Sequence, residues 1–308
     1  MAFPKFYQPD RVGTLFVPDT KTAISEGQAA GVRPSAEDSR RVILVLVDCQ
    51  VDFVHEDGAL YVPGAIEDMR RTIEWLFRNI EHVTAIAASL DTHIPLQIFY
   101  PTWWADKDGN HPQPYTVIKS EDVQGGRWRP LVEPDWSAQY VEKLEEQAKK
   151  ELMIWPYHTM LGTPGYAITP ALYEAIAYHS GARNAQPVFI SKGQIAKSEY
   201  YSMLEPEVKV PDHPQGTLNR DFLNILMNYD RIYIAGEAKS HCVLETVQSM
   251  LRHFKAEQPE VIDRTRILVD CTSPVAHPEI DFAAIADEAY AHFEEQGVHL
   301  VRSTDPLD

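Results

Sequence analysis

An aspartate, a lysine and a cysteine each lie where a predicted strand ends. Asp48 directly follows one apolar run, Lys192 ends another, and Cys242 comes six residues after a third run breaks at Gly236. The carboxyl ends of parallel strands meet at one edge of a sheet, where α/β proteins bind their ligands. A carboxylate there could take the thiol proton and pass it to a leaving amine, while an ammonium stabilises both charges. Together, the three side chains could carry out covalent amide chemistry.

Cys242 stands at the predicted start of a helix. Unpaired N–H groups and the helix dipole at such a position favour a thiolate and could hold an oxyanion. For a lone cysteine the alternative is a buried structural thiol, and the two other cysteines, Cys49 and Cys271, are interpreted in that way. The helix is indicated by apolar residues at helical spacing, namely Val243, Val247, Met250, Leu251 and Phe254.

A second group of polar residues follows the next predicted strand. Asp91 and His93 are two residues apart, and alternate residues of an extended chain point the same way. A carboxylate and an imidazole on one side form half of a Zn²⁺ or Fe²⁺ site. His158, in a Trp-Pro-Tyr-His turn, is a candidate third ligand. The alternative for the first two residues is an ordinary Asp–His hydrogen bond.

Apolar runs and helical periods alternate along the chain from residue 41 onward. Runs that are apolar throughout are typical of parallel strands covered on both faces. The alternation predicts an α/β fold, a three-layer, Rossmann-like sandwich with a mostly parallel six-stranded sheet. The predicted strands cover residues 41–47, 83–90, 187–191, 231–235, 266–269 and 298–301, and the predicted helices cover residues 66–80, 137–152, 170–180, 217–228, 242–254 and 279–296.

Two stretches lie outside this alternation. Residues 1–40 are predicted to be an N-terminal extension or arm, over the surface or onto a neighbouring subunit, with a short strand at residues 15–17. Residues 41–308 form the predicted domain, with a long insertion at about 94–153. The aromatic residues of that insertion are hypothesised to form a lid or a subunit contact: Phe99, Tyr100, Trp103 and Trp104.

The composition excludes some classes of partner. Of the 308 residues 44% are hydrophobic, which is ordinary for a globular protein. The formal charge of −17 argues against nucleic acid and anionic membranes as partners. Three cysteines, an odd and sparse set, indicate a reducing compartment. Because no segment has the length of a signal peptide core or a membrane span, a cytoplasmic protein is expected.

Five segments, in order along the chain, resemble the cysteine hydrolases of the isochorismatase-like superfamily, and most closely the nicotinamidases. Each segment alone is weak evidence, but the ordered set is specific. The segments are Val47–Phe53 (V-D-x-Q-x-D-F), Asp91–His93 (D-x-H), Trp155–His158 with Gly162–Gly165 (W-P-x-H and G-T-P-G), Lys192–Gly193 with Tyr201–Ser202 (K-G and Y-S), and Gly236–Val243 (G-x-x-x-x-x-C-V).

The resemblance implies an isochorismatase-like fold and a division of roles among the residues. Asp48, Lys192 and Cys242 would be the catalytic triad, in which a thioester forms on the cysteine. The backbone N–H groups of Ala238 and Cys242 would hold the oxyanion, next to a cis peptide at Glu237–Ala238. Nicotinamide would be hydrolysed to nicotinate and ammonia.

The resemblance also implies which residues bind the substrate and which bind a metal ion. The implied substrate-binding residues are Phe53, Trp155 and Tyr201. Ordinary core packing is the alternative for Phe53 and Trp155, and for Phe53 in particular. The implied metal ligands are Asp91, His93 and His158, with Zn²⁺ as the expected cofactor and Fe or Mn as alternatives. A homo-oligomer is expected as well.

The sequence departs from the family pattern in two places. Phe99 stands where some members carry a further metal-binding histidine, and His111 in the long loop is a weak substitute. The insertion could reshape the pocket, so the substrate could be a ureide, a carbamoyl compound or another small amide. From a different class, the chain could be a catalytically silent scaffold or binding protein, against which the complete Asp48, Lys192 and Cys242 set argues.

Overall fold

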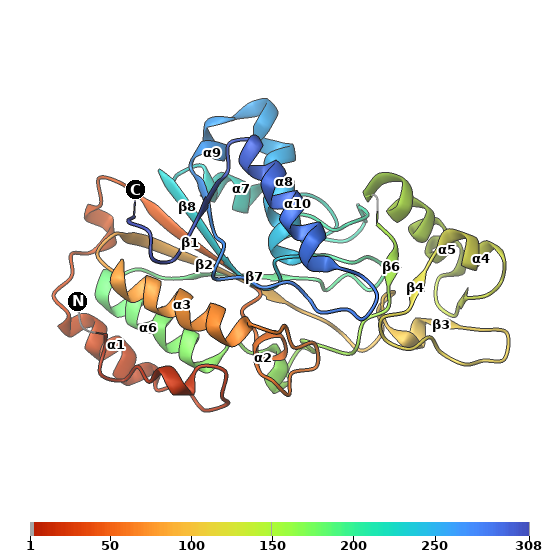
Figure 1. Cartoon of the computed structure of the whole chain (residues 1–308), viewed down its shortest axis with the longest axis horizontal. Helices are drawn as coiled ribbons and strands as arrows, with labels where there is room; N and C mark the ends of the chain where they lie inside the picture. Colours follow the sequence, from red (N-terminus) through yellow and green to blue (C-terminus); the bar gives the residue numbers. More distant parts are fainter. Residues whose placement is uncertain (1–2, 149, 308) are drawn as a thin grey trace.

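The computed structural model describes residues 3–148 and 150–307, and its centre is a single sheet of six strands (Figure 1). Every pairing within this sheet is parallel, and the strand order is β10-β9-β8-β1-β2-β7. The prediction of a six-stranded α/β sheet is therefore confirmed. The strands are β1 (Val42–Val47), β2 (Val83–Asp91), β7 (Val188–Lys192), β8 (Arg231–Gly236), β9 (Thr265–Leu268) and β10 (His299–Val301).

The all-apolar sequence of β1 arises from burial on both faces of the sheet. Successive side chains of a strand point to opposite faces, and those of β1 belong alternately to two hydrophobic cores. Leu44 packs in the same core as Trp75, whereas Val45 packs in the core that contains Val247. A central parallel strand therefore reads as a continuous apolar run.

Helices cover both faces, which completes the three layers (Figure 1). One layer contains α1 (Thr20–Ala29), α3 (Ala65–Arg78) and α6 (Pro170–Arg183), and the other contains α7 (Arg220–Leu226), α8 (Cys242–Glu257), α9 (Glu260–Asp263) and α10 (Phe282–Glu295).

The direction in which the chain crosses the sheet reverses at its centre. From β1 the chain proceeds through β2 to β7 at one edge, and then returns to β8 on the other side of β1 and continues to β9 and β10. The carboxyl ends of β1 and β8 therefore flank a topological switch point, where open α/β sheets form their ligand crevice. Asp48 and the segment leading to Cys242 leave the sheet at this point.

The N-terminal segment contains a helix that the sequence pattern did not reveal. Asp19 caps α1 by accepting a hydrogen bond from the Thr22 N–H at 3.0 Å. The helix packs on α6 at glycine contacts, because a Cβ on Gly27 would lie 2.3 Å from the Tyr178 carbonyl oxygen. The predicted strand at residues 15–17 is wrong, since this stretch forms no strand.

The predicted insertion forms a lobe beside the sheet (Figure 1). Trp103 and Trp104 are buried and donate hydrogen bonds to the Ser137 hydroxyl and the Ile98 carbonyl, so they build the interior of the lobe rather than an exposed contact. The helix predicted at 137–152 ends earlier than expected. The elements here are β3 (Trp104–Ala105), β4 (Val117–Ile118), α4 (Ser120–Gln124), β5 (Arg129–Pro130), α5 (Pro134–Lys143), a π-helical turn (Leu144–Ala148) and β6 (Leu152–Met153).

A helix that crosses a membrane needs about 20 predominantly apolar residues. Within residues 3–148 and 150–307, no helix is both long enough and apolar enough to do so. The predicted domain boundaries, the oligomeric state and the cytoplasmic location stay predictions.

Candidate active site

The three strand-end residues converge at the switch point. The Lys192 ammonium lies 2.9 Å from Asp48 Oδ2 and 3.7 Å from the Cys242 sulfur, and all three side chains are buried. The same ammonium contacts Asp91 Oδ1 at 3.0 Å and donates to the Tyr200 carbonyl at 2.9 Å. One buried cation therefore links both carboxylates to the thiol.

Asp48 is held by its neighbour on β2. The Ser89 hydroxyl donates a 2.6 Å hydrogen bond to Asp48 Oδ1 and accepts one from the Asp48 N–H at 3.0 Å. The backbone of Asp48 has a φ of 47°, in the left-handed region where residues other than glycine are uncommon. This conformation turns the chain sharply at the end of β1 and is supported from both sides by Ser89.

The nucleophile segment requires glycine at the end of β8. Gly236 has a φ of 120°, and a Cβ there would lie 2.1 Å from the Val47 carbonyl oxygen, so only glycine fits. The Glu237–Ala238 peptide is cis, which confirms that prediction. Among the described residues, the N–H groups of Ala238 and Cys242 donate to no protein acceptor. They are available for an oxyanion.

The charges at this point favour a neutral thiol in the resting protein. Burial raises the pKa of Cys242 well above its usual value, and Asp48 and Asp91 raise it further, while Lys192 lowers it. Burial also raises the pKa of Asp48, against the opposing effect of Lys192. Burial alone would lower the pKa of Lys192, but the two carboxylates raise it well above its ordinary range. The thiol therefore needs a base, and a carboxylate of raised basicity lies beside it.

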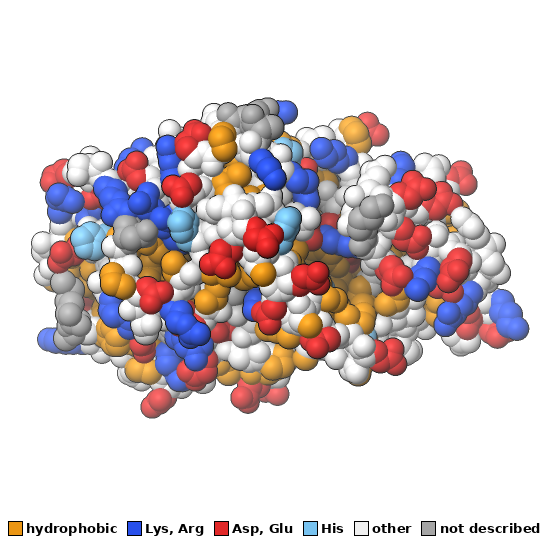
Figure 2. Space-filling model, turned by 45° about the horizontal axis from the view of Figure 1, so that its top comes forward, with side chains coloured by type: hydrophobic (Ala, Val, Ile, Leu, Met, Phe, Trp, Pro, Cys, Tyr) orange, Lys and Arg blue, Asp and Glu red, His pale blue; other side chains and the backbone are white. Residues whose placement is uncertain are grey.

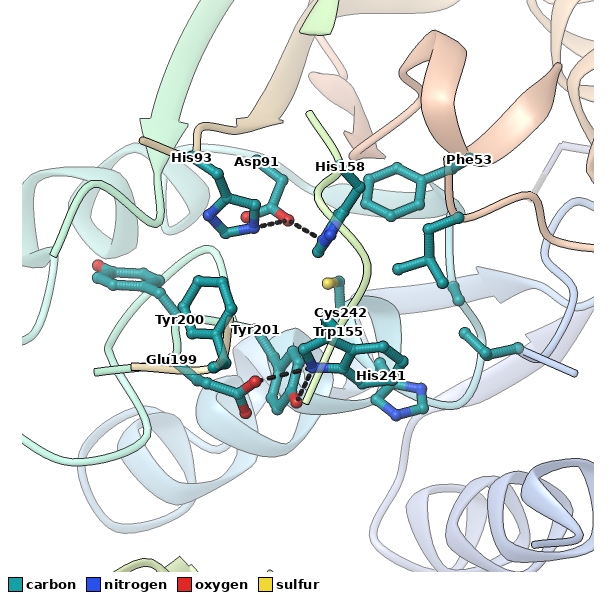
Figure 3. Close-up of a pocket in the computed structure, with 14 residues that line it drawn as sticks. Phe53, Asp91, His93, Trp155, His158, Glu199, Tyr200, Tyr201, His241 and Cys242 are labelled. Carbon is teal, nitrogen blue, oxygen red and sulfur yellow. Dashed lines mark hydrogen bonds and ion pairs between the residues drawn. The ribbon is translucent and has the colours of Figure 1, made fainter. Parts of the chain in front are cut away.

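Asp91, His93 and His158 form a second buried group. Their possible ligand atoms all lie within 4.8 Å of one another. Asp91 Oδ1 is engaged by Lys192, whereas Asp91 Oδ2 lies 2.9 Å from His93 Nε2 and 3.6 Å from His158 Nε2. The two oxygens of one carboxylate thus serve two different sets of residues, and Figure 3 shows the contacts of Asp91 with His93 and His158.

The donor set of this group fits a divalent metal ion. His158 Nδ1 is 2.7 Å from the Pro156 carbonyl, which fixes its proton on that nitrogen and leaves the Nε2 lone pair free for a metal. Burial lowers the pKa of His93, against the effect of Asp91, so this imidazole is neutral. Burial alone would raise the pKa of Asp91, but His93 and Lys192 lower it well below its usual range. Two imidazoles and a carboxylate are typical zinc ligands.

Aromatic side chains enclose the space between the thiol and the Asp91 group. Figure 3 shows the Cys242 sulfur pointing into a pocket bounded by His158, Trp155 and Phe53. We refer to this space as the Cys242 pocket. The remaining lining residues are Leu60, Asp91, His93, Phe99, Glu199, Tyr200, Tyr201, Ala238, His241 and Val275.

One wall of the Cys242 pocket is joined by hydrogen bonds. The Trp155 indole N–H lies 2.8 Å from Glu199 Oε1 and 3.1 Å from the Tyr201 hydroxyl. Burial raises the pKa of Glu199 to about 8, against the hydrogen bonds from Tyr201 and Trp155. His241 packs on this wall, with ring centroids 5.3 Å from Trp155 and 5.4 Å from Tyr201. The predicted substrate-binding residues Phe53, Trp155 and Tyr201 all line the pocket.

Other sequence hypotheses have different outcomes. Phe99 packs against His93 with ring centroids 4.9 Å apart and supplies no ligand. His111 lies outside the Asp91 group and bonds the Trp104 carbonyl. Cys49 and Cys271 are buried free thiols that do not line the pocket.

Sequence reasoning missed Ser89, Gln50 and Glu199. Gln50 donates from Nε2 to the Asp91 carbonyl at 2.9 Å and accepts from the Asp91 N–H at 2.7 Å. It therefore fixes the chain that presents Asp91. Its place in the V-D-x-Q-x-D-F segment was the available signal. Ser89 and Glu199 carried no such signal.

The fold and the site together define a structural class. The chain has an isochorismatase-like α/β fold, with an Asp–Lys–Cys network and a candidate metal group at the carboxyl edge of its sheet. No family model matches the sequence, and no curated protein is significantly similar to it.

Solved structures that share this fold include nicotinamidases. The chain is similar to the Acinetobacter baumanii nicotinamidase/pyrazinamidase structure, with a TM-score of 0.55 and 19% identity over 88% of this chain and 100% of that chain. It is similar to yeast nicotinamidase bound to the inhibitor nicotinaldehyde, with a TM-score of 0.58 and 18% identity over 85% of this chain and 99% of that chain. It is also similar to the L. infantum protein in complex with nicotinate, with a TM-score of 0.52 and 18% identity over 87% of this chain and 95% of that chain. These similarities establish the fold.

Proposed function

We propose that this protein is an amidohydrolase that cleaves a small amide, with nicotinamide as the first candidate, through a thioester on Cys242. One observation carries the proposal. A buried ammonium, that of Lys192, lies within 2.9 Å of a carboxylate and 3.7 Å of a thiol that lines a pocket. Burying three ionisable groups costs free energy, and such groups are concentrated at functional sites.

In the first half of the proposed reaction, Asp48 takes the thiol proton and the thiolate attacks the amide carbonyl. The charge that develops on the carbonyl oxygen is stabilised by the free N–H groups of Ala238 and Cys242. The protonated Asp48 then gives its proton to the leaving nitrogen, ammonia departs and a thioester remains. Lys192 stabilises the thiolate and the Asp48 carboxylate in turn.

In the second half, Asp48 takes a proton from water as the water attacks the thioester. The tetrahedral intermediate collapses, the carboxylic acid product leaves, and Cys242 recovers a proton from Asp48. Ser89 holds Asp48 Oδ1 throughout, which leaves Oδ2 beside Lys192 to exchange protons.

A divalent ion fits the group of Asp91, His93 and His158, and when bound it would supply a Lewis-acidic point at one end of the pocket. The solved proteins of this fold include one bound to nicotinaldehyde and one in complex with nicotinate. By that likeness we propose a pyridine carboxamide as substrate, packed between Phe53 and Trp155. A ureide or carbamoyl compound remains the second candidate, because the Asp48–Lys192–Cys242 network would act on any accessible small amide.

Ammonia release tests the proposal. Purified protein is assayed with nicotinamide and with a panel of small ureides, beside Cys242→Ala and the matched control Cys49→Ala, whose thiol is buried outside the pocket. We expect Cys242→Ala to lose activity by at least 10³-fold and Cys49→Ala to retain it. Turnover of a ureide alone would overturn the substrate while leaving the mechanism. No turnover of any amide, with Cys242 inert to iodoacetamide, would favour the scaffold hypothesis.

A further inference from the structure

A large groove adjoins the Cys242 pocket and is not used by the mechanism above. It lies between α8 and α10 on one side and the lobe with β6 on the other (Figure 1). Figure 2 shows a hollow in this region, beside the lobe, with hydrophobic side chains inside it. We call this space the α8 groove and define it by Lys150, Tyr201, Glu205, His241, Arg252 and Phe282.

The α8 groove and the Cys242 pocket share a wall. Tyr201 and His241 line both spaces, and their ring centroids are 5.4 Å apart. The Lys150 ammonium lies 5.2 Å from the centre of the Tyr201 ring. The groove therefore begins directly behind two aromatic side chains that line the Cys242 pocket.

Around Glu205, at one end of the α8 groove, the cationic side chains outnumber the carboxylates. The Glu205 carboxylate lies 3.1 Å from Arg252, 3.0 Å from His253 and 3.6 Å from Lys209. The side chains of Lys209 and Arg252 are 58% and 49% exposed, whereas that of Glu205 is 8% exposed. Two permanent cations thus lie beside this buried carboxylate, the Arg252 guanidinium also donates to the Ser249 hydroxyl at 2.8 Å, and the cations are the groups presented to solvent. In a chain of net charge −17 such a surface favours an anion.

The rest of the groove differs in charge. Lys150 is matched by Glu207 and Glu245, and it bonds both closely. On the lobe side, Glu145 accepts from Ser120. Apolar lining comes from α8 and from the C-terminal segment, namely Leu244, Ile280, Phe282, Ile285 and Ala289. Glu151 also lines this part of the groove, so its carboxylates outnumber Lys150, and an anionic group would find its cationic partners at the Glu205 end, with apolar surface along the way.

We propose that the α8 groove binds the tail of the substrate, and that this tail ends in a carboxylate held by Arg252 and Lys209. The inference rests on the proposed function, because it takes the scissile carbonyl to be at Cys242. It assigns the substrate to amides that have an apolar linker and an acidic end. Nicotinamide would then occupy only the Cys242 pocket and be a minimal substrate.

Two series of amides of increasing length test this. One series consists of monoamides of straight-chain dicarboxylic acids, which end in a carboxylate. The other consists of primary amides of straight-chain monocarboxylic acids of the same length, which end in a methyl group. For the unmodified protein we expect kcat/KM to favour the acid-ended series by at least ten-fold once the linker reaches Arg252. Arg252→Gln and Lys209→Gln should bring that ratio close to one, mainly through KM. Lys255→Gln, an exposed lysine of α8 outside the groove, should leave the ratio unchanged.

Calorimetry separates this inference from the proposed function. The Cys242→Ala variant is titrated with the same amides, so tail binding is measured even where no amide is turned over. Tighter binding of the acid-ended amides, lost in Cys242→Ala combined with Arg252→Gln, supports the groove. Equal binding of both series at every length, or a preference for amine-ended amides, overturns it. Absent turnover of nicotinamide and of both series counts against the proposed function alone.

Discussion

Replacing Lys192 with methionine removes the ammonium while keeping a side chain of similar length. The ammonium lies 3.7 Å from the Cys242 sulfur. At an effective dielectric constant of about 20, two unit charges at this separation interact by about 4 kcal/mol. That energy corresponds to roughly a thousand-fold change in the fraction of thiolate at a given pH. We expect Lys192→Met to lower the reactivity of Cys242 at neutral pH by about this factor.

The rate of alkylation by iodoacetamide between pH 6 and pH 10 measures this effect. Mass spectrometry of the labelled peptide distinguishes Cys242 from Cys49 and Cys271. In Lys192→Met the rise in alkylation rate should move to higher pH, because the thiolate has lost its nearest cation. Hydrolysis of nicotinamide should fall at least as far, since Asp48 loses the same cation.

The same substitution leaves Asp48 and Asp91 buried without their shared cation, at a cost of roughly 3–5 kcal/mol in the free energy of unfolding. Circular dichroism and thermal unfolding must therefore show that the variant is folded at the assay temperature. Lys192→Arg keeps the charge and serves as the matched control. If folded Lys192→Met is alkylated at the rate of the unmodified protein, the electrostatic role assigned to Lys192 is wrong.

Three further outcomes are expected. Ser89→Ala should lower kcat roughly ten-fold in steady-state assays, because the bond to Asp48 is charge-assisted. His158→Ala should reduce the zinc retained after dialysis, measured by mass spectrometry, whereas His111→Ala should not. Burial raises the pKa of Asp68 to about 6, so the contribution of this group to the free energy of unfolding is complete below about pH 4 and is lost as the pH rises through 6. Asp68→Asn should remove up to about 3 kcal/mol of this decline in the free energy of unfolding, measured by urea titrations.

Much of the fold could be predicted because its strands are buried on both faces. The run at 83–90 is observed as Val83–Asp91, and the other core runs agree to within one or two residues. Helix α1 was missed for a physical reason. Its buried face consists of Ala23 and Gly27, and such small residues give no apolar period although they allow close packing on α6.

The same reasoning explains which site residues could be predicted. Asp48, Lys192 and Cys242 follow strands, so the parallel-sheet rule alone brings them together. Ser89 lies inside β2, and it meets Asp48 only because of the register in which β1 and β2 pair. Glu199 meets Trp155 across 44 positions of chain through loop structure, which no strand or helix pattern specifies.

The position of β1 at the switch point also bears on how the protein assembles. Residues 42–47 pair with residues 231–236, so the first strand in the sequence completes its pairing only with a strand from the last third of the chain. Such non-local pairing makes folding slow. A fragment that ends before β8 contains Asp48 but lacks the cysteine and the strand that completes the crevice. Burial of the thiol in the completed crevice makes it slow to alkylate, so protection of Cys242 from iodoacetamide would be a late event in refolding and a specific indicator that both halves of the sheet have joined.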